Sequence, residues 1–127
     1  MREILFRGKR LDNGEWIEGS LWLYGEDARI DGALDFSEYF WHKVDPATVG
    51  QYTGLIDKNG KRIFEGDVLK KRGSGKERWL VSFCEGAFEV VGPLCSGSFR
   101  DDYSADNFEV VGNIHDNPEL LEVTHEV

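Results

Sequence analysis

The central segment of the chain, residues 48–69, reads TVGQYTGLIDKNGKRIFEGDVL and decides the fold. Two short apolar runs, residues 55–56 and 63–64, flank the polar residues 57–60. Asn59 followed by Gly60 supplies the positive φ angles of primed hairpin turns, which join antiparallel strands. The segment therefore predicts strand, tight turn and strand, with Gly60 at positive φ.

Further strands are expected on both sides of this hairpin. Apolar and β-branched runs bounded by turn residues occupy residues 4–7, 15–24, 39–44, 67–71, 78–84, 87–91 and 107–111. Gly19 falls inside the longest run and predicts a bulge or a close backbone approach. A helical turn is expected only near residues 118–121, where Asn117 can cap and Pro118 can start a helix. The chain thus reads as all-β, with more than a third of its residues in strands.

The expected organisation has three parts. Asp45 and Pro46 mark a boundary, because Pro fixes φ and cannot donate to a strand ladder. Residues 1–47 then form an N-terminal β region, residues 48–114 a second strand-rich region, and residues 115–127 a tail with a short helical turn. Residues 25–38 are polar, acidic and glycine-containing, which predicts a loop.

Composition and charge narrow the function classes. The chain has 127 residues, 40% of them hydrophobic, and a formal net charge of -9. This charge disfavours non-specific binding to nucleic acid or to an anionic membrane. No apolar run has the length of a membrane span, no secretory segment is recognisable, and Cys84 and Cys95 form no Cys-x-x-Cys pair. A reduced, cytoplasmic protein in the host cell is expected.

One basic cluster interrupts this acidic chain, at the tip of a predicted hairpin: Lys70, Lys71, Arg72, Lys76 and Arg78. It has two interpretations. Lysines at a hairpin tip can simply protect a sheet edge, or the cluster can contact phosphates while Trp79 stacks on a base. The alternation of Trp79 with Val81 and Phe83 favours a core position for Trp79, which weakens the second interpretation.

The chain shows no organised catalytic or metal-binding pattern. Cys84, His115 and Asp116 are the available thiol, imidazole and carboxylate, but no spacing brings them together. The segment Gly73-Ser74-Gly75-Lys76 lacks the earlier glycine and the following Ser or Thr of a phosphate loop. No recognised metal spacing organises the candidate ligands His42, His115, His125, Asp101, Asp102 and Asp106. We therefore expect no catalytic residues, no cofactor and no metal.

Three blocks of the sequence resemble the YopX-like family of bacteriophage and prophage proteins. They are residues 6–19, residues 49–68 and residues 109–121. The resemblance implies an all-β fold in which an N-terminal β region packs with a C-terminal SH3-like small barrel. It also implies self-association and a phage or prophage origin, and it carries over no catalytic residues, because the family has no established activity.

The motif residues are explained as structure. Their small size or short polar side chains suit tight backbone positions: Gly54, Asp57, Asn59, Gly60, Gly66 and Asp67. Gly112 fits the same explanation. We interpret these residues as shaping turns rather than as a binding site.

A homo-oligomer is expected from the N-terminal half. Residues 21–24 are apolar on both faces of a strand, and no helix is predicted to cover the second face. Another copy of the chain, or a host or phage protein, can provide the cover. The sequence thus predicts a non-enzymatic oligomeric interaction or accessory module, with nucleic-acid binding through the basic cluster as the alternative.

Overall fold

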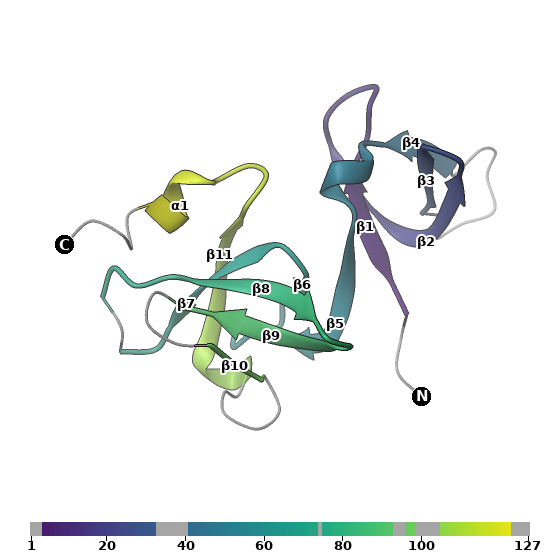
Figure 1. Cartoon of the computed structure of the whole chain (residues 1–127). Helices are drawn as coiled ribbons and strands as arrows, with labels where there is room; N and C mark the ends of the chain where they lie inside the picture. The colour runs from purple at the N-terminus through teal and green to yellow at the C-terminus, as the bar shows by residue number, and fades with distance from the viewer. Residues whose placement is uncertain (1–3, 33–40, 74, 93–95, 99–104, 123–127) are drawn as a thin grey trace. The chain divides into compact units, whose positions relative to one another are not determined.

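The computed structural model describes residues 4–32, 41–73, 75–92, 96–98 and 105–122 (Figure 1). More than half of these residues are in strands, and their helical segments are short. The all-β prediction is confirmed. The chain divides into two compact units, Met1–Tyr52 and Thr53–Val127, whereas the sequence places the boundary after residue 47.

The first unit is built on an antiparallel sheet with the strand order β4-β3-β2-β1-β5. Its strands are β1 (Phe6–Lys9), β2 (Trp16–Tyr24), β3 (Asp27–Asp31), β4 (Trp41–Val44) and the first half of β5 (Gly50–Ile56). The expected boundary is a single turn of 3-10 helix, η1 (Pro46–Thr48), capped by the Asp45 carboxylate at 3.0 Å from the Ala47 N–H. β5 itself runs without interruption across the division between Tyr52 and Thr53.

The loop predicted for residues 25–38 is wrong over residues 27–31, which form β3. Ala28 and Ile30 point into the core of the first unit, where they pack with Val44. Because these two apolar residues alternate with Asp27, Arg29 and Asp31, the period-two pattern of a half-buried strand is present but is obscured by charge. Residues 33–38 lie outside the described part of the chain.

Gly19 of β2 is a point of close backbone approach, as predicted. It pairs with Phe6 of β1, and a Cβ at this position would overlap the backbone carbonyl of Asp31 on β3. A side chain here would separate β2 from β3. The glycine therefore permits the sheet to continue from β1 to β4.

The second unit contains the other half of β5, its neighbour β6 (Arg62–Phe64), and a sheet with the order β10-β9-β8-β7-β11. The strands of that sheet are β7 (Asp67–Lys71), β8 (Trp79–Cys84), β9 (Ala87–Val91), β10 (Ser96–Ser98) and β11 (Phe108–Asn113). The core consists of side chains that are almost completely buried: Ile63, Leu69, Trp79, Val81, Val90 and Phe108. The two antiparallel sheets agree broadly with the expected SH3-like barrel, although closure of a barrel stays a prediction.

Two short helical segments complete the second unit. η2 (Ala105–Asn107) precedes β11, and α1 (Glu119–Glu122) follows it. The helical turn expected near residues 118–121 is confirmed by α1. The strand β10 was not predicted, because Ser96, Gly97 and Ser98 carry no apolar pattern.

The loop between β5 and β6 is organised by one carboxylate. The Oδ1 atom of Asp57 accepts hydrogen bonds from the N–H groups of Asn59 (2.8 Å) and Lys61 (2.9 Å). Its Oδ2 atom accepts a third from the Val110 N–H of β11, at 2.9 Å. Burial raises the pKa of Asp57, but the N–H groups of Val110, Lys61 and Asn59 together hold it below its ordinary value of 3.8.

Gly60 adopts the predicted positive φ, +83°. The turn type is different from the predicted primed turn, because Asn59 does not have a positive φ. The Asp57 N–H donates to the Lys61 carbonyl at 2.8 Å and the Gly60 N–H donates to the Asp57 carbonyl at 3.0 Å. This pattern is a longer hairpin loop with a left-handed glycine at its end.

Asp67, at the start of β7, also binds a backbone N–H group through its carboxylate, as Asp57 does. Its carboxylate is 1% exposed, and its Oδ2 atom accepts a hydrogen bond from the Phe64 N–H at 2.8 Å. Gly54 and Gly66 also have positive φ angles, +88° and +93°. At Gly112, a Cβ would overlap the side chain of Asn117.

Candidate functional site

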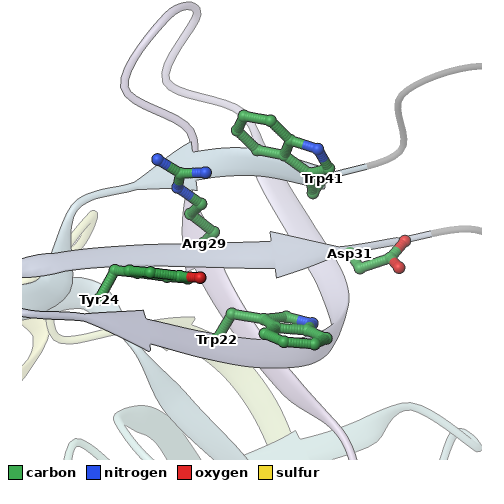
Figure 2. A pocket seen from close by; sticks show the side chains of 5 residues that line it. All are labelled: Trp22, Tyr24, Arg29, Asp31 and Trp41. Atoms are coloured by element: carbon green, nitrogen blue, oxygen red, sulfur yellow. The ribbon is translucent and has the colours of Figure 1, made fainter.

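The most site-like feature among the described residues is a pocket on one face of β2, β3 and β4 (Figure 2). It has a volume of about 240 Å³. Its lining combines aromatic and charged side chains: Trp22, Tyr24, Arg29, Asp31 and Trp41. The strand register assembles them, because Trp22 lies opposite Arg29, and Asp31 lies opposite Trp41. All five therefore project from the same side of the sheet.

The two faces of this three-stranded region differ sharply. The face opposite the pocket carries the buried residues Ala28, Ile30 and Val44. On the pocket face, the exposed fractions are 57% for Trp22, 66% for Tyr24 and 44% for Trp41. Large aromatic side chains are thus left in solvent by the strands that build the core of the first unit.

Arg29 is the central charged group of the pocket. Its guanidinium carbon lies 4.4 Å from the ring centroid of Trp41 and 5.6 Å from that of Tyr24. Both distances fall within the range of cation–π contacts. The Nε atom is buried without a hydrogen-bond partner. The two rings therefore hold the guanidinium in place through stacking rather than through an ion pair.

The other charges of this face lie on either side of Arg29. Lys43 of β4 is directly opposite Arg29 in the strand register, and its Nζ atom lies 3.8 Å from the Asp27 carboxylate. Figure 2 shows Asp31 at the end of the pocket away from Tyr24. Asp27 is therefore engaged by Lys43, and Asp31 lies two residues further along β3 than Arg29.

The basic cluster of the sequence is placed on β7, on β8 and on the turn between them. Lys70 and Lys71 belong to β7, where Lys70 faces Glu109 of β11. The Arg78 Nη1 atom donates to the carbonyls of Gly75 (3.0 Å) and Glu77 (2.9 Å), so this guanidinium is used within the turn. Lys70, Arg72 and Lys76 are exposed.

Trp79 is not available to stack on a base. Its side chain is 4% exposed, and its ring lies against Phe108 with a centroid distance of 5.9 Å. The predicted core position of Trp79 and Val81 is confirmed. Phe83, in the same alternation, is 48% exposed because β8 extends past the core at the β8–β9 turn.

The candidate catalytic and metal-binding residues are dispersed over several elements. Cys84 is exposed at the end of β8, while His115 and Asp116 lie in the turn after β11, where both backbone N–H groups donate to the Asn113 side chain. His42 lies on β4 and Asp106 in η2. In the described ranges no three His, Cys, Asp or Glu residues form a group that could hold a metal ion. The other candidates lie outside those ranges: Cys95, Asp101, Asp102 and His125.

The sequence matches a model of the family described as YopX protein over residues 5–122. The chain belongs to the YopX family. A crystal structure of protein EF1440 from Enterococcus faecalis is similar to it, with a TM-score of 0.55 and 24% sequence identity. That alignment covers 95% of this YopX protein and 99% of the other chain, and it shows a shared fold. No functionally curated protein matches the sequence.

None of the helices in the described part of this YopX protein is long and apolar enough to cross a membrane.

The sequence does not predict the aromatic pocket, although the two-sided apolar character of residues 21–24 indicates its β2 wall. The sequence signal for the β3 wall of the pocket is the alternation of Arg29 and Asp31 with Ala28 and Ile30. Recognising it requires the register that sets these residues opposite Trp22 and Trp41.

Proposed function

We propose that this YopX protein is a non-enzymatic protein-interaction module, encoded by a phage or prophage, that works as a homo-oligomer in the host cytosol. The observation that supports the proposal is the exposure of Trp22 and Tyr24, together with Leu23, which is 70% exposed on the other face of β2. Aromatic residues are enriched at protein interfaces and depleted from ordinary surfaces.

The exposed residues have the arrangement of an interface. Trp22 and Tyr24 of β2 and Trp41 of β4 lie on either side of β3 and share one face, while Leu23 extends the apolar surface around the end of β2. Single exposed apolar residues need no explanation, but contiguous ones mark interaction sites. Another copy of the chain, or a host or phage protein, is the proposed cover for this end of the sheet.

Mass measurement by light scattering tests the proposal. The wild-type protein is expected to elute at several times the monomer mass across micromolar concentrations. A Trp22→Ser, Tyr24→Ser double variant is expected to shift towards the monomer, because it removes the central aromatic area of the interface. Phe83→Ser serves as the control, since Phe83 is similarly exposed but belongs to the second unit. A monomeric wild type, or a double variant with unchanged mass, would contradict the proposal.

Nucleic-acid binding through the basic cluster is the second candidate function. The exposure of Lys70, Arg72 and Lys76 favours it, whereas the burial of Trp79 removes the stacking contribution. We expect binding at physiological salt to be no tighter than the non-specific range of about 10⁻⁴–10⁻⁶ M. Retention on single-stranded DNA is measured at increasing salt for the wild type and a Lys70→Glu, Lys71→Glu, Arg72→Glu variant. A tight complex that this triple change abolishes would place the second candidate first.

A further inference from the structure

The pocket of β2–β4 presents a cation whose orientation is set before any partner arrives. The Arg29 guanidinium lies over the rings of Trp41 and Tyr24, at 4.4 and 5.6 Å. Stacking leaves the planar edge of a guanidinium free to donate hydrogen bonds, and that edge matches a carboxylate. Within the described residues, Arg29 has no ion-pair partner.

The charges around Arg29 favour an anionic group at one end of the pocket. Asp27 is engaged by Lys43, which leaves Arg29 without a compensating carboxylate on that side. Asp31 lies two residues along β3, which corresponds to about 6–7 Å of strand. The net charge of the whole chain acts at longer range and is screened beyond about 8 Å at physiological salt. Contact recognition therefore depends on Arg29, at the end of the pocket away from Asp31 (Figure 2).

The size of the pocket selects the kind of ligand. Its volume of about 240 Å³ is below the roughly 300–1,000 Å³ of sites for cofactors and drug-sized molecules. Figure 2 shows the Trp22 ring along the β2 side of the pocket, where it offers an apolar surface next to the charged group. A side chain with a neighbouring apolar residue fits this combination of volume, charge and aromatic surface.

We propose that the pocket binds an acidic side chain of a partner polypeptide, with its carboxylate on the terminal nitrogens of Arg29 and the adjacent apolar residue on Trp22. This inference rests on the proposed interaction function and specifies its contact chemistry. The partner segment is one in which Glu or Asp adjoins an aromatic or aliphatic residue. The rings of Trp41 and Tyr24 cover the face of the guanidinium, while the carboxylate pairs with its edge.

Short peptides test the inference by nuclear magnetic resonance. The probes are the capped dipeptides acetyl-Phe-Glu-amide, acetyl-Phe-Gln-amide and acetyl-Phe-Lys-amide, and the readout is the indole N–H signals of Trp22 and Trp41. The Glu probe is expected to shift both signals and to bind at least about tenfold more tightly than the Gln probe, because charge-assisted hydrogen bonds are the stronger ones. An octathymidylate serves as a fourth probe for single-stranded nucleic acid.

Two Arg29 variants and a matched control complete the experiment. Arg29→Gln is expected to remove the preference for the Glu probe, and Arg29→Lys to weaken Glu binding severalfold, because Lys retains the charge but loses the planar fork. Arg72→Gln makes the same charge change in an exposed turn of the second unit and is expected to leave binding unchanged. The comparison of Glu and Gln probes on the wild-type protein stands even if a variant fails to fold.

Several outcomes would overturn the inference. Equal binding of the Glu and Gln probes shows that no carboxylate is recognised. A preference for the Lys probe shows that the rings take a cation, and tight binding of octathymidylate at Trp22 shows a nucleic-acid surface. If assembly depends on Trp22 and Tyr24 while the probes show no preference, the proposed function stands and this inference fails. If the Glu preference is found but the oligomeric mass does not depend on Trp22 and Tyr24, the proposed function fails instead.

Discussion

The β5–β6 loop and the aromatic face of β2–β4 differ in how completely their polar groups are satisfied. In the loop, the Asp57 carboxylate accepts three backbone hydrogen bonds, and Asp57 is 3% exposed. On the aromatic face, the Arg29 Nε atom is buried without a partner, and Trp22 and Tyr24 stand more than half exposed. The loop is complete within the chain, whereas the face is the surface where we propose that a partner binds.

The most distinctive part of the sequence and the proposed binding surface lie in different regions of the chain. Residues 48–69 are the most recognisable part of this YopX protein, yet their side chains are used to fix a turn and to tie it to β11. The exposed aromatic face lies in strands whose sequence is much less distinctive. The segment of this chain that most resembles the family therefore shapes a turn, while the proposed contact surface lies elsewhere.

The largest expected effect comes from removing the Asp57 carboxylate. Asp57→Ala leaves the N–H groups of Asn59, Lys61 and Val110 without their acceptor, and we expect a loss of about 3 kcal/mol in the free energy of unfolding. Urea denaturation at pH 7 measures the change. Asp12→Ala is the control, because the Asp12 carboxylate forms an exposed ion pair with Arg10, and no measurable change is expected. Equal effects of the two substitutions would show that the loop is not a structural centre.

A smaller effect is expected at Gly60. Gly60→Ala forces an L residue to a φ of +83°, which costs about 1–2 kcal/mol although the added Cβ has open space beyond its chain neighbours. Gly75→Ala is the matched substitution, since Gly75 also has open space but not a positive φ. It is expected to change the free energy of unfolding by less than about 0.5 kcal/mol. Thermal or urea unfolding of the pair isolates the backbone conformation from packing.

The pH dependence of stability provides a finer test of the loop. Because the pKa of Asp57 is lower in the folded state, the unfolded chain takes up the proton first as the pH falls. The stabilisation is therefore fully present above the ordinary value of 3.8 and is lost as the pH drops through the folded pKa. We expect the urea midpoint of the wild type to fall more steeply below about pH 4 than that of Asp57→Asn. Parallel curves for the two proteins would contradict the assignment.

The smallest effect on stability is expected on the aromatic face. Trp22→Ser is predicted to change the free energy of monomer unfolding by no more than about 0.5 kcal/mol, because the indole is 57% exposed. The measurement is made at protein concentrations below any assembly threshold. A loss comparable with that of Asp57→Ala would show that Trp22 supports the fold, and the contrast between the two regions would disappear.

Local signals account for the parts of the fold that the sequence predicts correctly. Gly60 and Pro118 act through their own backbone preferences, so the positions of the central hairpin and of the terminal helical turn follow from short range alone. β3 was missed because three charged residues surround Ala28 and Ile30, and only packing against Val44 distinguishes the strand from a loop. Strand propensity is a weak predictor where burial decides whether a segment forms a strand.

The pocket depends on information that a single strand does not contain. Trp22, Arg29 and Trp41 meet only because β3 pairs with β2 and β4 in one particular register, and a slip of one residue would turn Arg29 to the opposite face. The basic cluster, in contrast, was found by simple proximity in sequence. Part of this cluster is engaged within its own turn, because Arg78 donates to the carbonyls of Gly75 and Glu77.

The uninterrupted course of β5 has a consequence for how this protein can be cut. Division points between compact units usually fall in exposed linkers, where proteases and gene truncations act most easily. Here the division between Tyr52 and Thr53 falls inside a hydrogen-bonded strand. A truncation at that point would leave each fragment with half a strand and an unpaired edge, which promotes aggregation. The two units are thus expected to be stable only when they are expressed together as one chain.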